Sequence, residues 1–173
     1  MAVTLPRAQP LRLLAGVLVL LLFTVEPATA DDQPAQTTAL LIDGKVKRAQ
    51  RLSVDALHRL PAERVDVSFQ TSHGTEKSSY TGVLLWRLLD EAGGIDDPAK
   101  GAELHHTISI TARDGYTVVI STGEIAPDFG GKAAMIAYER DGVELGAQGL
   151  RVIMPGDRHG GRYVRDVVEM EVK

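Results

Sequence analysis

The chain has 173 residues, a formal net charge of −4 and no cysteine. Its length is sufficient for one domain with a sizeable hydrophobic core. The acidic balance argues against nucleic acid or an anionic membrane surface as the main partner. The lack of cysteine excludes disulfides and thiolate metal ligands, so the stability of the fold must come from packing.

The first 30 residues have the pattern of a secretory signal peptide. Arg7 and Arg12 give a positive start, and residues 13–25 form an uncharged apolar run. Ala28 and Ala30 fit a small-x-small cleavage site. The apolar run is short for a membrane span, which needs about 20 residues. The two arginines are not adjacent, so no twin-arginine export signal is visible.

We therefore expect three segments along the chain. Residues 1–30 would be a cleaved general secretory signal, residues 31–38 a flexible leader, and residues 39–173 a single domain. The protein would then be periplasmic or secreted, with no membrane span after signal cleavage.

Hydrophobic periodicity within the domain predicts many short strands and few short helices. The expected strands are residues 39–46, 65–69, 107–112, 116–121, 133–138 and 150–154, with a closing strand in which Val168, Met170 and Val172 alternate with Glu169 and Glu171. Ser53 fits the N-cap of a short helix over residues 54–60. Gly82 precedes an expected amphipathic helix that Gly93 ends, with Leu84, Leu85, Leu88, Leu89 and Ala92 on one face and Trp86 as a packing residue. Residues 70–81 predict a polar loop.

A basic loop with two glycines, residues 158–162, follows the strand at residues 150–154. Its glycines leave backbone N–H groups open, and its arginines can hold an anion at two points. The loop therefore suits a phosphate-like group. From the residues alone, a solvated turn with basic side chains is the alternative.

Three stretches resemble the oxidoreductase molybdopterin-binding domain family, which has the sulfite-oxidase-like fold. They are YTGVLLWRLLDEAGG (residues 80–94), ARDGYTVVISTGEI (residues 112–125) and LRVIMPGDRHGGRYVRDVVEMEV (residues 150–172). The resemblance covers residues 39–173 in order. It implies an α+β fold: a β-rich single domain with mixed sheets and a few short helices.

The resemblance also implies an oxidoreductase that binds molybdenum on a pterin dithiolene, with one cysteine thiolate as the protein ligand. The position that would hold this cysteine, twelve residues before Gly82, is Gln70. Thiolate is a soft anionic ligand that suits a transition metal, whereas a glutamine amide is a weak neutral donor. Exported members of the family receive their cofactor in the cytoplasm and cross the membrane folded, which a general secretory signal does not allow. We therefore expect molybdopterin, although implied by the family, to be absent.

The same resemblance places a binding cleft between the loop at residues 70–74 and the loop at residues 158–165. The candidate cofactor-binding or ligand-binding residues are Gln70, His73, Arg158, His159, Gly160, Arg162, Tyr163 and Arg165. No catalytic residue and no metal ligand is assigned. His105 and His106 are adjacent, so in a strand their rings would point to opposite faces and could not easily chelate one ion.

Three functions are consistent with these features. The leading hypothesis is an exported domain of the family without molybdenum redox activity, which acts as a periplasmic module that binds a small anion or assists a periplasmic protein. The alternative is a divergent molybdopterin-dependent oxidoreductase of the sulfite oxidase or sulfoxide reductase type without a cysteine ligand. The third is an interaction protein that presents a sheet surface while its cleft stays empty.

Overall fold

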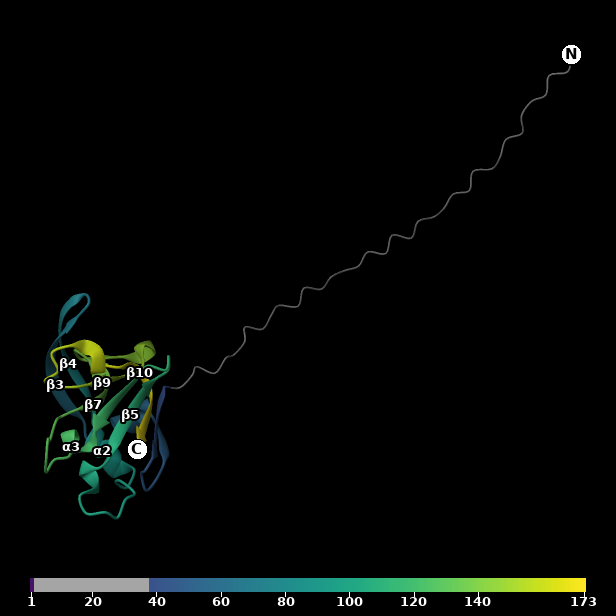
Figure 1. Cartoon of the computed structure of the whole chain (residues 1–173). Coiled ribbons are helices and arrows are strands. Elements are labelled where there is room, and N and C mark those ends of the chain that lie inside the picture. The colour runs from purple at the N-terminus through teal and green to yellow at the C-terminus, as the bar shows by residue number, and fades with distance from the viewer. Residues whose placement is uncertain (2–37) are drawn as a thin grey trace. The chain divides into compact units, whose positions relative to one another are not determined.

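The structure, a computed structural model, describes Met1 and residues 38–173 (Figure 1). The expected signal peptide and nearly all of the expected leader lie outside the described residues. From residue 38 onward the chain is mostly strand with a few short helices, which confirms the predicted β-rich α+β class. None of the helices in this part is both long and apolar enough to span a membrane.

Sixteen elements follow one another along residues 39–172. In chain order they are β1 (Ala39–Gly44), β2 (Gln50–Ser53), α1 (Val54–His58), β3 (Glu63–Thr71), β4 (Gly74–Leu84), α2 (Leu85–Glu91), η1 (Ala102–Leu104), β5 (Thr107–Ala112), β6 (Thr117–Ser121), α3 (Thr122–Ile125), β7 (Met135–Arg140), β8 (Val143–Glu144), η2 (Gly146–Gln148), β9 (Leu150–Ile153), η3 (Gly160–Arg162) and β10 (Arg165–Val172). The η elements are short 3₁₀ turns.

The strands of the described region form one branched, mixed sheet, as predicted. Its main path runs β2-β1-β10-β9-β7-β4-β3, while β5 joins β10 and carries β6, and β8 pairs with β7. β1 and β10 are parallel, and the other pairs are antiparallel. β10 meets both branches because its pairing shifts along residues 165–169, where Asp166 has a φ of 50°.

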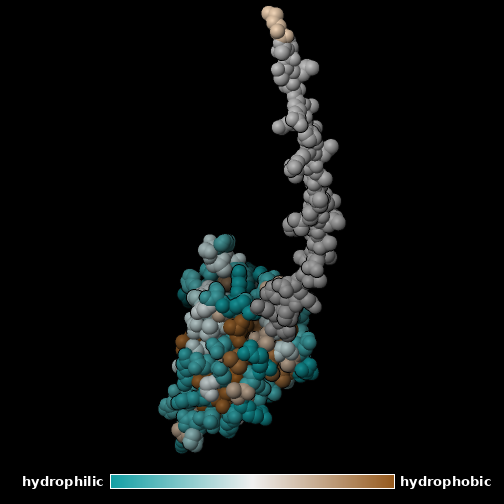
Figure 2. Space-filling view, turned by 90° about the vertical axis from the view of Figure 1, so that its right-hand side faces the viewer, coloured by the Kyte–Doolittle hydropathy of each residue, from teal (hydrophilic) through white to brown (hydrophobic). Residues whose placement is uncertain are grey.

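The buried faces of the strands and of α2 make one hydrophobic core. Leu85, Leu88 and Leu89 of α2 are buried, and Trp86 packs partly buried against the core, as predicted. The face of the molecule in Figure 2 is mainly hydrophilic, with hydrophobic residues in a few small areas. Burial of these apolar side chains is the main stabilising term available to a chain without disulfides.

The prediction of a polar loop over residues 70–81 is wrong. Residues 74–84 are strand β4, which pairs with β3 from Glu63 opposite Gly82 to Thr71 opposite Gly74. Gly74 makes the tight turn with a φ of +112°, a value that side chains other than glycine rarely allow. The segment is polar because much of this hairpin is exposed, while its serines, threonines and tyrosine suit a pleated surface. The expected helix consequently starts at Leu85 rather than directly after Gly82.

Two smaller differences concern strands. β2 was not predicted, because its four residues show no apolar alternation, but it pairs with β1 along its whole length. In β10 the predicted alternation is interrupted by the pairing shift. Val167 is fully buried, whereas Val168 is only partly buried.

Strand β6 allows a matched test of the core. Ile120 is 1% exposed and its neighbour Val119 is 57% exposed. We expect Ile120→Ala to lower the free energy of unfolding by about 2–5 kcal/mol, because it removes buried methyl groups and leaves a cavity. Val119→Ala should change it by less than about 0.5 kcal/mol. Urea unfolding followed by circular dichroism measures both, and equal losses would contradict the assigned register of β6.

Candidate functional site

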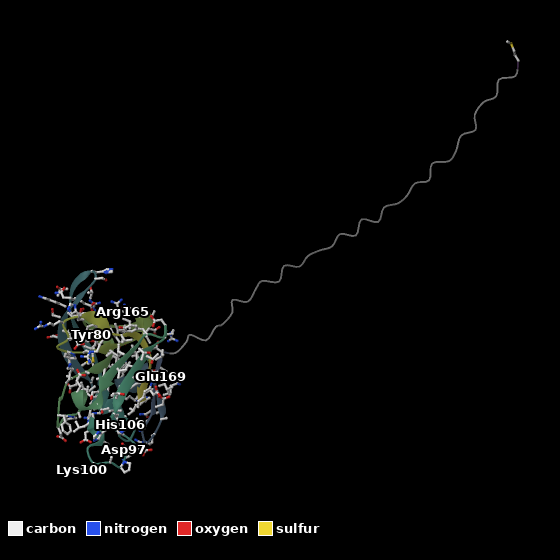
Figure 3. The ribbon with its side chains drawn as sticks, in the orientation of Figure 1. Tyr80, Asp97, Lys100, His106, Arg165 and Glu169 are labelled. Carbon is white, nitrogen blue, oxygen red and sulfur yellow. The ribbon has the colours of Figure 1, made fainter. Side chains whose placement is uncertain are left out.

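A cleft of about 900 Å³ opens at one end of the domain, beside the basic loop. Four segments line it: the end of β3 with the turn that follows, the tip of the β5–β6 hairpin, strand β9, and residues 159–165. Arg165, which is one of the lining residues, is labelled near this end in Figure 3. The two loops that the sequence predicts as the walls of a binding site therefore do border one cavity.

Five of the eight predicted site residues line this cleft. They are Gln70, His159, Gly160, Tyr163 and Arg165. The other three lie elsewhere. His73 is exposed at the β3–β4 turn, with its Nδ1 3.3 Å from the Ser72 hydroxyl. Arg158 contributes its main-chain oxygen, and Arg162 is held by carboxylates as described below.

The basic loop is fixed to the end of β3 by main-chain contacts. The Gln70 N–H donates to the Arg158 carbonyl oxygen at 2.9 Å, and Gln70 forms a parallel bridge with His159. Gly160 follows directly, and a Cβ at this position would lie 3.2 Å from two atoms of the Phe69 ring. This glycine therefore permits the loop to lie close against the aromatic side chain, and the loop is not a free solvated turn.

Arg162 is occupied by an ion-pair network. Its Nη2 donates to Asp157 at 2.6 Å, and its Nη1 donates to Glu124 at 3.2 Å. Lys132 also donates to Glu124. Burial would raise the pKa of Glu124, but the hydrogen bonds from Arg162 and Lys132 outweigh it and hold the pKa below its ordinary value. Arg162 therefore fastens the basic loop to α3 and is not available as an anion ligand in this arrangement.

Arg151 on strand β9 also lines the cleft. It is not among the residues that the sequence predicts for the site. It is 5% exposed, and its Nη1 donates to the Tyr80 hydroxyl at 2.6 Å and to Glu76 at 3.1 Å. Its Nε is buried without a hydrogen-bond partner, and its Nη2 makes no hydrogen bond with any described residue. An arginine within the apolar run LRVIM was the signal that could have identified it, because charged residues are almost never fully buried unless they are paired.

The partners of Arg151 are themselves perturbed. Burial would raise the pKa of Glu76, but hydrogen bonds from Tyr80 and Arg151 outweigh it, so its pKa is lowered and the carboxylate stays ionised. Burial and the hydrogen bond to Glu76 raise the pKa of Tyr80 to about 12. Tyr80 donates to Glu76 at 2.6 Å, which leaves its oxygen free to accept from Arg151. The Arg151 Cζ also lies 5.7 Å from the ring centroid of Phe69 and 5.2 Å from that of Tyr80. The hydrogen bonds of the guanidinium to described residues are thus all made by Nη1, and Nε and Nη2 make none.

Arg165 stands directly opposite Arg151 in the β9–β10 pairing. Side chains at opposed positions share a face of the sheet, and like charges there repel each other. Arg165 is exposed and has no ion-pair or hydrogen-bond partner among the described residues, and both arginines line the cleft. This pair concentrates positive charge at one wall of the cavity, where an anion would relieve the repulsion.

The residues at the expected metal position do not fit molybdenum. The chain has no cysteine, and the Gln70 amide donates from Nε2 to the Thr75 hydroxyl at 2.9 Å across the hairpin. Residues 38–173 contain no group of three or more histidine, cysteine, aspartate or glutamate side chains that could hold a metal ion. A neutral amide engaged in the hairpin is a poor replacement for a thiolate. The side chains at this position therefore do not offer the soft anionic donor that molybdenum would need.

The histidine pair lies at the other end of the domain (Figure 3). His105 is exposed, whereas His106 is buried between Asp97 and the main-chain oxygen of Lys173, each 2.8 Å from one ring nitrogen. The two adjacent residues therefore have different surroundings, one exposed and one buried. His106 fastens the loop before β5 to the end of β10 and has no connection to the cleft.

Comparison with solved structures identifies the fold. A search of solved structures finds the sulfane dehydrogenase SoxCD from Paracoccus pantotrophus, with a TM-score of 0.64 and 20% sequence identity. The match covers 79% of this chain and 38% of the SoxCD chain, so this chain spans well under half of that relative. At this identity the likeness establishes the fold alone. No significant match was found among curated proteins.

The family comparison gives the same result by sequence. The profile of the family described as "Oxidoreductase molybdopterin binding domain" matches residues 27–173, which includes both walls of the cleft. The predicted resemblance is thereby confirmed, and the chain belongs to the oxidoreductase molybdopterin-binding domain family.

Proposed function

We propose that this protein is an exported member of the family that carries no molybdenum and binds a small anion in the cleft beside Arg151 and Arg165. It would act as a periplasmic binding or accessory module, and a periplasmic protein would be the partner that uses the bound anion. The observation that carries this proposal is the guanidinium of Arg151, which is 5% exposed and has no acceptor for Nε or Nη2 among the described residues.

Physical chemistry makes that arrangement costly without a ligand. A buried donor without an acceptor destabilises a protein by roughly 1–3 kcal/mol, and more when the group is charged. An anion that accepts from both Nε and Nη2 would satisfy the buried donor, Nε, and would also screen Arg151 from Arg165. The cleft opens directly onto these residues, so the anion has a path from solvent.

Two features support the absence of redox chemistry. Gln70 stands where the resemblance places the thiolate ligand, and the chain contains no cysteine. The first 30 residues favour export of an unfolded chain, which would reach the periplasm without a cofactor inserted in the cytoplasm.

Anion binding is tested most simply with acetate. Titration of the purified protein with sodium acetate at constant ionic strength, followed by amide NMR shifts, should saturate around the Arg158–Arg165 loop. Arg165→Gln should weaken binding about three- to tenfold, because a partly exposed charged hydrogen bond is lost. Arg51→Gln is the matched control, since Arg51 is also an exposed strand arginine but lies on β2 outside the cleft. Equal losses in both variants would show that only the overall charge matters.

Metal analysis tests the redox half of the proposal. Protein purified from its own host should contain far less than one molybdenum per chain and no extractable pterin, because no thiolate is present to hold the metal. A molybdenum enzyme purified from the same cells is the control for cofactor supply. Stoichiometric molybdenum would refute the proposal and favour the alternative of a divergent oxidoreductase. Retention of that metal in Gln70→Ala would then exclude Gln70 as its ligand.

A further inference from the structure

We infer that the ligand of the cleft is an organic monoanion, a carboxylate carried on an aromatic body, and not an inorganic oxyanion. This inference rests on the proposed function, because it names the class of anion that the same cleft would bind. It depends on three properties of the cavity: the balance of charges in its lining, the chemistry of its walls and its size.

The charge balance favours a single negative charge. The charged and titratable lining residues are Arg151, Arg165, Asp114 and His159. With the imidazole neutral, these groups carry one net positive charge. Glu76 lies 3.1 Å from Arg151 but is also paired with Arg140 at 3.6 Å, so the charges of Glu76 and Arg140 cancel and the site keeps one net positive charge. A monoanion would therefore balance the lining, whereas the second charge of a dianion would lie near two carboxylates without a cation of its own.

The walls of the cleft offer aromatic surface. Phe69 and Tyr163 stack at the floor, with ring centroids 3.8 Å apart and an interplanar angle of 20°. Tyr116 stands at the hairpin tip with 52% of its surface exposed, and its hydroxyl donates to the Gly161 carbonyl oxygen at 2.8 Å. A ring that is exposed yet held by a hydrogen bond provides a fixed surface against which another ring can stack.

The size of the cleft agrees with a ligand larger than an oxyanion. Its volume of about 900 Å³ lies within the range of roughly 300–1,000 Å³ that is typical of sites for organic molecules. An inorganic oxyanion at Arg151 and Arg165 would fill a small part of this space and would leave Tyr116 without a contact. A carboxylate on an aromatic body would use the arginines and the aromatic wall together.

Calorimetric titration of the purified protein with four probes at constant ionic strength tests this inference. Benzoate carries the charge and the ring, acetate the charge alone, sulfate two charges without a ring, and benzyl alcohol the ring without the charge. We expect benzoate to bind at least tenfold more tightly than acetate or sulfate, and benzyl alcohol to show no saturable binding.

Variants at Tyr116 test the aromatic wall without disturbing the core, because this side chain is half exposed. Tyr116→Ala should weaken benzoate about fivefold and leave acetate unchanged, while Tyr116→Phe, which keeps the ring, should retain most of the benzoate affinity. Val119→Ala is the control, since Val119 is equally exposed on β6 but does not line the cleft.

The outcomes separate the two proposals. If sulfate or acetate binds as tightly as benzoate, the organic ligand is refuted and the proposed anion-binding function stands. If Tyr116→Ala loses acetate and benzoate affinity equally, the inferred contact between the ligand and the aromatic wall is refuted, and the anion-binding function still stands. If none of the three anions binds, or if benzyl alcohol binds as tightly as benzoate, the anion-binding function fails together with this inference.

Discussion

The guanidinium of Arg151 is the group on which the interpretation of this site depends. It lies within the sheet on β9, between apolar neighbours in the sequence. Its hydrogen bonds go to Glu76 and Tyr80 from Nη1 only, while its Cζ lies over the rings of Phe69 and Tyr80. Isolated charges are not stable in a protein interior, so a buried arginine is normally surrounded by acceptors. Here the unsatisfied side belongs to a residue that lines a cleft and is adjacent to a second arginine, Arg165, that has no carboxylate partner in the described region. The fold thus presents a positive site that is open to solvent.

The remaining structure keeps this site in place. The hairpin of β3 and β4 supplies Glu76 and Tyr80, the hydrogen-bond partners that orient Arg151. The basic loop is held against the same hairpin through Gln70 and is anchored on its other side by the carboxylates that bind Arg162. The basic loop, which the sequence predicts as a site for a phosphate-like group, is therefore held in place on both sides, and its arginines have different roles. Arg162 stabilises the loop, and Arg165 faces the cleft.

Much of the fold could be predicted from the sequence, because its core strands and α2 have clear apolar periodicity. The spacing of the leucines predicted α2, and the alternation of apolar residues predicted the β5–β6 hairpin. Strand β4 was missed because its residues are mostly polar, and its pairing with β3 is a long-range property that composition does not show. Five of the eight candidate site residues lie on one cleft, and their role as ligands stays a prediction. Arg151 was not predicted: an arginine in an apolar run marks an unusual position, but it does not show which of its nitrogens lack a partner.

The chain keeps the scaffold of its family, and Gln70, which the resemblance places at the metal-ligand position, has its amide engaged with Thr75. In the function proposed above, Arg151 and Arg165 would bind a carboxylate through directed hydrogen bonds. A crystal structure of the protein purified from its own host tests this account most directly. We predict electron density for a bound anion whose oxygen lies about 2.7–3.2 Å from Arg151 Nη2, with no heavy atom beside Gln70. An anomalous molybdenum signal at Gln70, or a protein carboxylate that occupies Arg151 Nη2, would contradict it.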